Sequence, residues 1–202
     1  MKRFISILLV LVLGVSIFTG CKKDDESSAE SSNNSDVTYY ADIVIKEYGT
    51  ITVKLDAKTA PITVENFVSL AKSGFYDGLT FHRIMEGFMM QGGDPKGNGT
   101  GDSGKRIKGE FAVNGVPNNI SHKRGVISMA RGGYSYDSAS CQFFIMHADA
   151  PTLDGQYAGF GYVTSGMDVV DAVCTSAKPT DNNGTIPKAE QPVIEKITIR
   201  EE

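Results

Sequence analysis

The chain has 202 residues, which is enough for one ordinary domain with a well-buried core and some additional segments. Its formal net charge is −4, and removal of residues 1–20, which include Lys2 and Arg3, leaves 18 basic against 24 acidic side chains, or −6. The sequence shows no basic stripe, so the composition argues against a nucleic-acid partner.

Residues 1–20 have the layout of a signal peptide. Two basic residues precede an apolar run over residues 4–18, which is short for a bilayer span and is followed by small residues. The Phe-Thr-Gly-Cys sequence at residues 18–21 resembles a bacterial lipobox, although Phe18 stands where an aliphatic residue is usual. An uncleaved signal anchor is the alternative. We favour lipidation of Cys21, because this cysteine stands where the apolar run meets a polar segment, and both alternatives place the domain outside the cytoplasm on the outer face of the membrane.

Residues 21–38 are rich in Lys, Asp, Glu, Ser and Asn. Such a segment buries too little apolar surface to offset the entropy cost of ordering, so we expect a flexible linker between the lipidated Cys21 and a domain over residues 39–202.

The domain begins with a predicted hairpin over residues 43–55, in which apolar residues alternate with polar ones on either side of Tyr48-Gly49. A helix of about three turns follows, because Pro61 suits a first turn and apolar residues recur with helical spacing before Gly74. Val64, Phe67, Val68 and Ala71 form its apolar face.

Further along the chain, one more helix and several short strands are predicted. The helix covers residues 167–176, with Val169, Val170 and Val173 on its inner face. Many short strands with only two helices indicate a mostly antiparallel closed barrel. The strands are expected at residues 79–84, 125–130, 142–146, 159–163 and 193–200, with a glycine-rich loop at 92–109.

The most informative stretch is residues 81–94, where Arg83 lies among Phe, Met and Gln residues before paired glycines. A guanidinium is always charged and costly to bury without acceptors, so this pattern favours a pocket wall over a plain core strand. Similar β-rich stretches carrying amide or aromatic side chains follow at residues 125–131 and 142–145.

These motifs together resemble the cyclophilin-type peptidyl-prolyl isomerases over roughly residues 40 to 200. The resemblance is carried by Phe81-His82-Arg83, Gly87-Phe88-Met89 with Gln91-Gly92-Gly93-Asp94, Ser128-Met129-Ala130, Gln142-Phe143-Phe144-Ile145, Leu153-Asp154-Gly155 and Phe160-Gly161. It implies an eight-stranded closed antiparallel barrel with a helix over each open end, and a catalyst of X-Pro isomerisation.

Such a reaction needs no nucleophile and no acid–base pair. The amide rotation barrier is about 18–20 kcal/mol, and X-Pro bonds interconvert over roughly tens to hundreds of seconds. Reaching about a thousand events per second needs on the order of 7 kcal/mol of transition-state stabilisation. The prolyl nitrogen regains a lone pair in the twisted state, so a fixed donor aimed at it binds that state selectively. Arg83 is the predicted catalytic donor, with a surface-paired arginine as the alternative.

The resemblance also implies which residues bind the substrate. Phe88, Met89, Phe144 and Leu153 would grip the proline ring, whereas Phe143, alternating with Phe144, is assigned to the core. The remaining predicted binding residues are Gln91 and Gln142 for the substrate backbone, Ala130, Arg131 and Gly132 for the residue preceding proline, Tyr157 at the rim and Gly99 in the loop.

Three positions depart from the family's animal members. Thr152 replaces a tryptophan, which predicts weak cyclosporin binding, and Tyr157 replaces a histidine. Arg131 replaces an asparagine, which favours acidic residues near the substrate proline.

Other motifs are weaker. The Gly99 to Arg106 stretch approaches a phosphate-binding pattern but has Arg106 where Ser or Thr should hold magnesium, so we interpret it as a surface loop beside the pocket. His147 and Asp149 lack a Gly-x-Ser-x-Gly elbow for a hydrolase triad. The three histidines are widely spaced without further ligands, so neither a metal site nor a cofactor is predicted.

Cys141 and Cys174 lie in a compartment where a disulfide can persist, yet two buried thiols are the favoured interpretation.

We expect a monomer that acts on proline-containing unfolded or exported polypeptides. The alternative function is a proline-peptide binding module, or holdase, without essential turnover.

Overall fold

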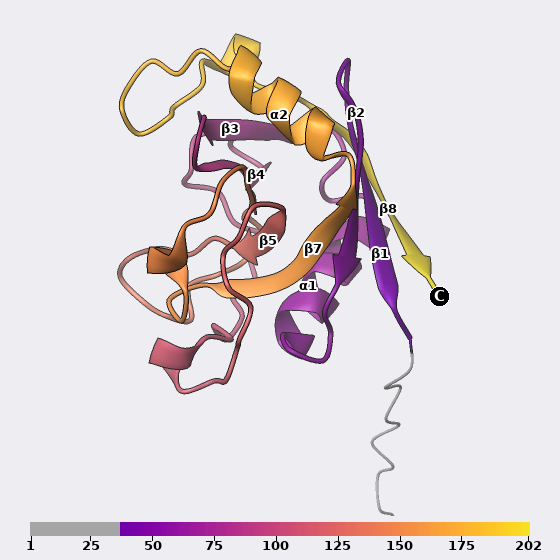
Figure 1. The fold of residues 1–202 in the computed structure, drawn as a ribbon, viewed down its shortest axis with the longest axis vertical. Coiled ribbons are helices and arrows are strands. Elements are labelled where there is room, and N and C mark those ends of the chain that lie inside the picture. The colour runs from indigo at the N-terminus through magenta and orange to yellow at the C-terminus, as the bar shows by residue number, and fades with distance from the viewer. Residues whose placement is uncertain (1–36) are drawn as a thin grey trace, which may run out of the picture. The chain divides into compact units, whose positions relative to one another are not determined.

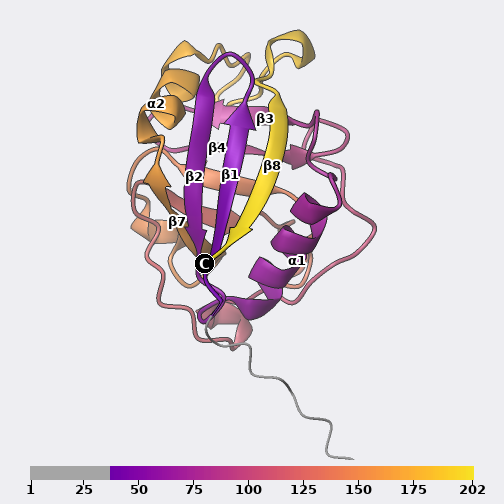
Figure 2. The same ribbon diagram turned by 90° about the vertical axis from the view of Figure 1, so that its right-hand side faces the viewer.

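The computed structural model describes residues 37–202. The predicted signal peptide, the lipidated Cys21 and most of the predicted linker lie outside the described residues. Eight strands and two α-helices form the described part of the chain, as Figures 1 and 2 show. In order they are β1 (Tyr39–Ile45), β2 (Gly49–Leu55), α1 (Pro61–Lys72), β3 (Thr80–Met85), β4 (Met89–Asp94), β5 (Val126–Met129), β6 (Phe143–Met146), β7 (Ala158–Ser165), α2 (Met167–Ser176) and β8 (Ile194–Glu201).

The strands form one antiparallel sheet in the order β3-β4-β6-β5-β7-β2-β1-β8. The prediction of a closed barrel was wrong, because β3 and β8 do not pair along their length and the sheet is an open, strongly curled half-barrel. A single bridge, between Thr80 and Val193, links the two edges within the described residues. The mostly β architecture with two helices is confirmed.

The segment preceding β8 explains the open edge. Most of the outer edge of β3 pairs with residues 184–186, since the amide of Ile84 donates to Gly184 and the amide of Ile186 donates to His82. Pro187 and Pro192 follow, and a proline has no N–H to continue a ladder. The chain therefore leaves the β3 edge after residue 186 and returns to it only at the start of β8, where the amide of Phe81 donates to the carbonyl oxygen of Pro192 and the amide of Ile194 donates to that of Leu79.

The two helices lie at opposite ends of the curled sheet (Figures 1 and 2). Helix α1 begins at Pro61 and buries the predicted apolar face, and α2 buries Val169, Val170 and Val173. The N-cap residue of α1, Ala60, makes no capping hydrogen bond through its side chain. Instead, the buried carboxylate of Glu110 accepts hydrogen bonds from the amides of Ile62 and Thr63, at 3.1 and 2.8 Å. A distant loop thus satisfies two donors that every helix leaves free.

Strand β4 was not among the predicted strands, and its residues 92–94 were assigned to the glycine-rich loop. Gly92 is needed in the strand, since a Cβ atom would lie 2.8 Å from the Phe81 ring and 2.9 Å from the carbonyl oxygen of Thr80. The glycines mark close contact between β3 and β4, which positions Arg83 beside Gln91 in the ladder.

Cys141 and Cys174 are both buried, and neither forms a disulfide within the part of the chain that the structure describes. Burial raises the pKa of Cys141 to about 11 and that of Cys174 to about 12. The interpretation as two buried thiols is confirmed for the structure.

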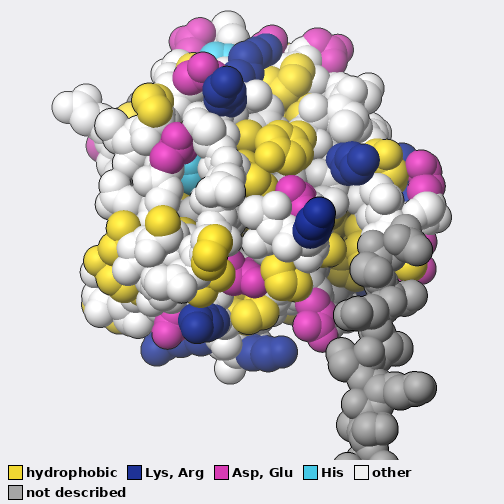
Figure 3. All heavy atoms as spheres, turned by 60° about the horizontal axis from the view of Figure 1, so that its bottom comes forward, with side chains coloured by type: hydrophobic (Ala, Val, Ile, Leu, Met, Phe, Trp, Pro, Cys, Tyr) yellow, Lys and Arg dark blue, Asp and Glu magenta, His cyan; other side chains and the backbone are white. Residues whose placement is uncertain are grey.

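On the face drawn in Figure 3, acidic and basic side chains are interspersed among apolar patches. Within residues 37–202, none of the helices has the length and apolar character needed to span a bilayer.

Candidate active site

Arg83 projects from β3 into a half-buried position. Its Nε atom donates to the carbonyl oxygen of Asn183 at 2.7 Å, and its Nη1 atom lies 3.3 Å from Oε1 of Gln91. The guanidinium carbon is 5.9 Å from the centre of the Phe88 ring. Burial lowers the pKa of Arg83, whereas Tyr157 and Asp181 raise it. The side chain is therefore oriented by neutral acceptors and not by a surface ion pair.

A chain of amides extends from this guanidinium. Gln91 accepts from Arg83 and donates through Nε2 to Oε1 of Gln142 at 3.0 Å, and Gln142 donates to the carbonyl oxygen of Gly101 at 2.9 Å. These bonds fix the orientation of both amides, because each oxygen and each nitrogen has a defined partner. One N–H of Gln91 remains available to a ligand.

A cavity of about 140 Å³ with both apolar and polar lining residues opens beside Arg83. We call it the prolyl cavity. Phe144 is 5% exposed and forms its floor, and Phe143 on the opposite face of β6 is fully buried in the core, so the division between the two phenylalanines agrees with the prediction. The lining residues are Arg83, Phe88, Met89, Gln91, Ala130, Arg131, Phe144, Leu153 and Tyr157.

The other three predicted site residues, Gly99, Gly132 and Gln142, line a second cavity of about 370 Å³. This cavity shares Gln91, Ala130 and Arg131 with the prolyl cavity. The structure thus brings all twelve predicted residues to one connected region, and their individual roles stay predictions.

Three aromatic rings surround Arg131, and sequence reasoning did not identify this arrangement. Its guanidinium carbon lies 4.8, 5.1 and 5.3 Å from the ring centres of Tyr157, Tyr136 and Phe111. Its Nε atom donates to the carbonyl oxygen of Gln156 at 3.0 Å. Cation–π contacts of this kind hold a guanidinium in one place. No spacing in the sequence connects residues 111 and 136 with the pocket, because separate loops bring them there.

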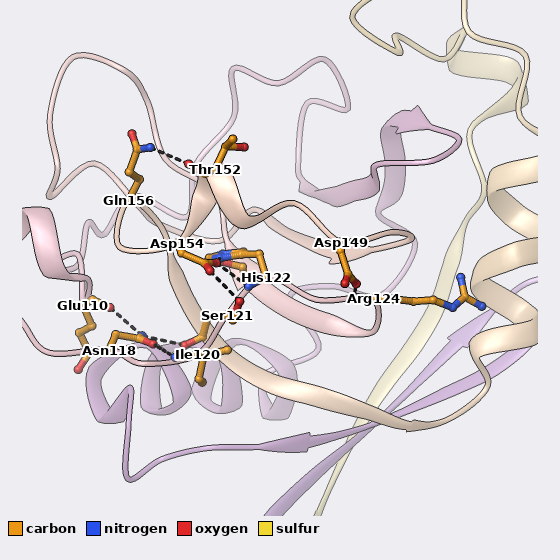
Figure 4. A network of polar contacts seen from close by, with 12 residues as sticks. Glu110, Asn118, Ile120, Ser121, His122, Arg124, Asp149, Thr152, Asp154 and Gln156 are labelled. Carbon is orange, nitrogen blue, oxygen red and sulfur yellow. Dashed lines mark hydrogen bonds and ion pairs between the residues drawn. The ribbon is translucent and has the colours of Figure 1, made fainter.

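A polar network lies beneath the cavity floor (Figure 4). The His122 ring stacks on Phe144, with Nδ1 3.0 Å from Asp154 and Nε2 3.0 Å from the hydroxyl of Ser128. Because a carboxylate only accepts, Nδ1 carries the proton and Nε2 accepts from Ser128. Burial lowers the pKa of His122, while Asp154 raises it. Ser128 is fully buried, so this arrangement supports the floor and offers no accessible nucleophile.

His147 and Asp149 do not contact each other as a catalytic pair. His147 accepts from the amide of Gly87 at 2.8 Å and lies 3.2 Å from Asp171, whereas Asp149 accepts from the amide of Arg124. The rejection of a hydrolase triad agrees with these contacts. Within residues 37–202, no three His, Cys, Asp or Glu side chains cluster as metal ligands would.

Asp94 organises the loop beside the cavities. It is 1% exposed and accepts from the amides of Lys96, Asn98 and Gly99. Burial raises the pKa of Asp94, but these amide bonds outweigh it and the net shift is downward. The ionised carboxylate therefore holds the glycine-rich loop against the site, as the interpretation of a surface loop beside the pocket requires.

Comparison with known proteins assigns this arrangement to a family. The model of the family described as "Cyclophilin type peptidyl-prolyl cis-trans isomerase/CLD" matches residues 40–200. A peptidyl-prolyl cis-trans isomerase of Helicobacter pylori is 50% identical over 138 residues, which are 67% of this chain and 80% of the relative. The peptidyl-prolyl cis-trans isomerase B of Bacillus subtilis is 46% identical over 125 residues, 62% of this chain and 83% of the relative.

The fold is also similar to a crystal structure of a Cryptosporidium parvum cyclophilin-type isomerase studied in the presence of the dipeptide Ala-Pro. The TM-score is 0.70 with 27% sequence identity, and the match covers 80% of this chain and 98% of the other.

Proposed function

The chain belongs to the family of cyclophilin-type peptidyl-prolyl cis-trans isomerases and catalyses rotation about X-Pro peptide bonds, and we propose that Arg83 is the group that stabilises the twisted amide. One observation carries this assignment. Arg83 and Arg131 both line the prolyl cavity, and Arg83 is the one whose orientation is set by Asn183 and Gln91 before any ligand enters.

The proposed mechanism follows from what lies on each side of the rotating bond. The proline ring enters the prolyl cavity above Phe144, while the free N–H of Gln91 holds the substrate backbone. As the bond twists, the prolyl nitrogen pyramidalises and accepts from the Arg83 guanidinium. Because planar amides offer no such lone pair, this hydrogen bond lowers the barrier without tightening ground-state binding.

Isomerisation of an Ala-Pro peptide by the full chain, with and without Arg83, tests the role of the guanidinium. We expect Arg83→Ala to lower kcat/KM by about 10²- to 10³-fold, the usual cost of removing one electrostatic donor. Arg83→Lys keeps the charge but lacks the planar guanidinium that contacts both Asn183 and Gln91, so it should recover only part of the rate. Equal rates for wild type and Arg83→Ala would reject the role of Arg83.

We also propose that the enzyme assists the folding of exported polypeptides from a lipid anchor at Cys21. Support comes from the sequence alone, because the apolar run over residues 4–18 ends at this cysteine and a polar segment separates it from the domain. Metabolic labelling with a palmitate analogue should mark the wild type and not Cys21→Ser. Label on Cys21→Ser, or no label on the wild type, would reject the anchor.

A further inference from the structure

His82 on β3 is a buried histidine that the proposed mechanism does not use. It is 5% exposed, and neither of its ring nitrogens has a hydrogen-bond partner within residues 37–202. Buried side-chain nitrogens normally have a hydrogen-bond partner, because a buried nitrogen without one has lost its hydrogen bonds to water and gained none in the protein. His82 therefore has hydrogen-bonding capacity that the fold leaves open.

The imidazole lines a cavity of about 350 Å³, here called the His82 cavity. Gly99 forms its roof, and a Cβ atom at this position would lie 3.7 Å from Nε2 of His82. The segment that pairs with the β3 edge supplies the opposite wall. The lining residues are His82, Arg83, Gln91, Asn98, Gly99, Asn183 and Thr185.

The His82 cavity is continuous with the active site. Arg83 and Gln91 line both this cavity and the prolyl cavity, and Gln91 and Gly99 also line the second cavity of the site. A peptide seated at the prolyl cavity therefore has two ways out. One passes Ala130 and Arg131, the proposed edge for the residue preceding proline. The other passes Arg83 and enters the His82 cavity.

The lining is polar, and Arg83 is the one charged side chain that residues 37–202 contribute to it. Asn98, Asn183 and Thr185, which carry amide or hydroxyl side chains, line the cavity together with the imidazole. Burial lowers the pKa of His82, Asp94 raises it, and Arg83 and Lys188 lower it. The ring is thus neutral, with one donor and one acceptor. An uncharged ligand group that both donates and accepts pairs with either nitrogen, whereas an ion pairs with only one.

We propose that the His82 cavity is a specificity subsite, which takes a hydroxyl or carboxamide side chain from the substrate residue that follows proline. This inference rests on the proposed function and extends it, because it names the side chains that the enzyme prefers on the far side of the rotating bond. The ligand group makes the hydrogen bond that the buried imidazole lacks, with Asn183 as a second partner.

The test compares pairs of peptides of nearly equal shape, Ala-Ala-Pro-Asn-Ala against Ala-Ala-Pro-Leu-Ala, and Ala-Ala-Pro-Thr-Ala against Ala-Ala-Pro-Val-Ala. Isomerisation by the full chain is followed by NMR exchange, which needs no protease. We expect kcat/KM to be about three- to tenfold higher for Asn than for Leu and for Thr than for Val, the range of one net hydrogen bond. Equal values in both pairs would overturn the subsite.

Three variants assign the preference to the cavity. The Asn-to-Leu ratio is measured within each variant, so that a general change of activity cancels. His82→Phe and Asn183→Ala should both bring the ratio towards one, and Asn183→Ala remains informative if His82→Phe does not fold. Asn182→Ala is the matched control, because Asn182 is the exposed neighbour that does not line the cavity.

The remaining outcomes are also decisive. A ratio unchanged in both His82→Phe and Asn183→Ala would overturn the proposal even if the wild type prefers Asn. A preference for Asn two residues before proline, and not after it, would overturn the assigned direction. Failure of the wild type to isomerise any peptide would instead reject the proposed function, so the two failures are distinguishable.

Discussion

Phe143 and Phe144 are neighbours in β6, yet they belong to different parts of the molecule. Phe143 faces the inside of the curled sheet. Its ring makes edge-to-face contacts with Phe67, Tyr76 and Phe81, and the distances between ring centres are 5.4 to 6.0 Å. Phe144 faces outward into a smaller cluster that borders the prolyl cavity. The inner face is packed on all sides, while the outer face keeps one side open for a ligand. We therefore expect the same residue type to serve stability on one face and substrate binding on the other.

The largest expected effect separates the two faces by stability. Phe143→Ala removes a fully buried ring from a close-packed cluster and should lower the free energy of unfolding by about 3–5 kcal/mol. Phe144→Ala, which already borders an open cavity, should cost clearly less. Urea denaturation of both variants measures the difference, and equal losses would contradict the division between the faces.

The next effect reverses the order of the two variants. Phe144→Ala removes the floor on which the proline ring rests and should lower kcat/KM by about tenfold or more, the value of burying one apolar side chain. Phe144→Leu keeps apolar volume and should recover part of this loss. Isomerisation of an Ala-Pro peptide is the measurement. Full activity of Phe144→Ala would remove the floor from the proposed site.

Buried polar groups extend the comparison. On the inner side, Glu110 supplies the N-terminal acceptor of α1 and is 2% exposed. Glu110→Gln keeps the shape but can offer only one amide oxygen and no charge to the helix dipole, so we expect a loss of about 1 kcal/mol in the free energy of unfolding. Glu65→Gln, at an exposed position of α1, is the control and should be nearly neutral. Equal effects would contradict the capping role.

The smallest expected effect is a dependence of stability on pH. Burial lowers the pKa of both His82 and His122, so the unfolded chain takes up protons at a higher pH than the folded protein. Stability is therefore complete above the ordinary histidine pKa of about 6.5 and falls as the pH drops below it. Urea denaturation between pH 8 and pH 5 measures this fall. His82→Phe should make it shallower, and an unchanged slope would contradict the contribution of His82.

The elements that the sequence predicts well are those with local signals. Apolar periodicity located both helices and their inner faces, and alternation located the first hairpin. The ordered motifs around Arg83, Gln91, Gln142 and Phe144 were sufficient to place twelve residues at one region. Strand β4 was not among the predicted strands, because its Gly92 and Gly93 carry a loop signal, although close approach to Phe81 requires a glycine at residue 92 in the strand.

Features that depend on several distant segments carried no such signal. The aromatic rings around Arg131 come from residues 111, 136 and 157, and the bonds of His122 come from residues 128 and 154. The barrel was predicted closed from the many short strands with only two helices and from the family resemblance, and neither records how the edge strands end. Whether the two edge strands meet depends on the path of residues 184–192, which alternation does not record.

The sequence by itself determined which residues are apolar on each face, where the chain turns, and which family these motifs belong to, since all of these follow from the order of side chains along a local backbone. Tertiary structure alone decided that the sheet stays open, that Glu110 caps α1, and that His82 is buried beside Arg83 without a hydrogen-bond partner among residues 37–202. Each of these depends on which chain segments lie within a few ångströms of one another, and that proximity is a property of the folded molecule.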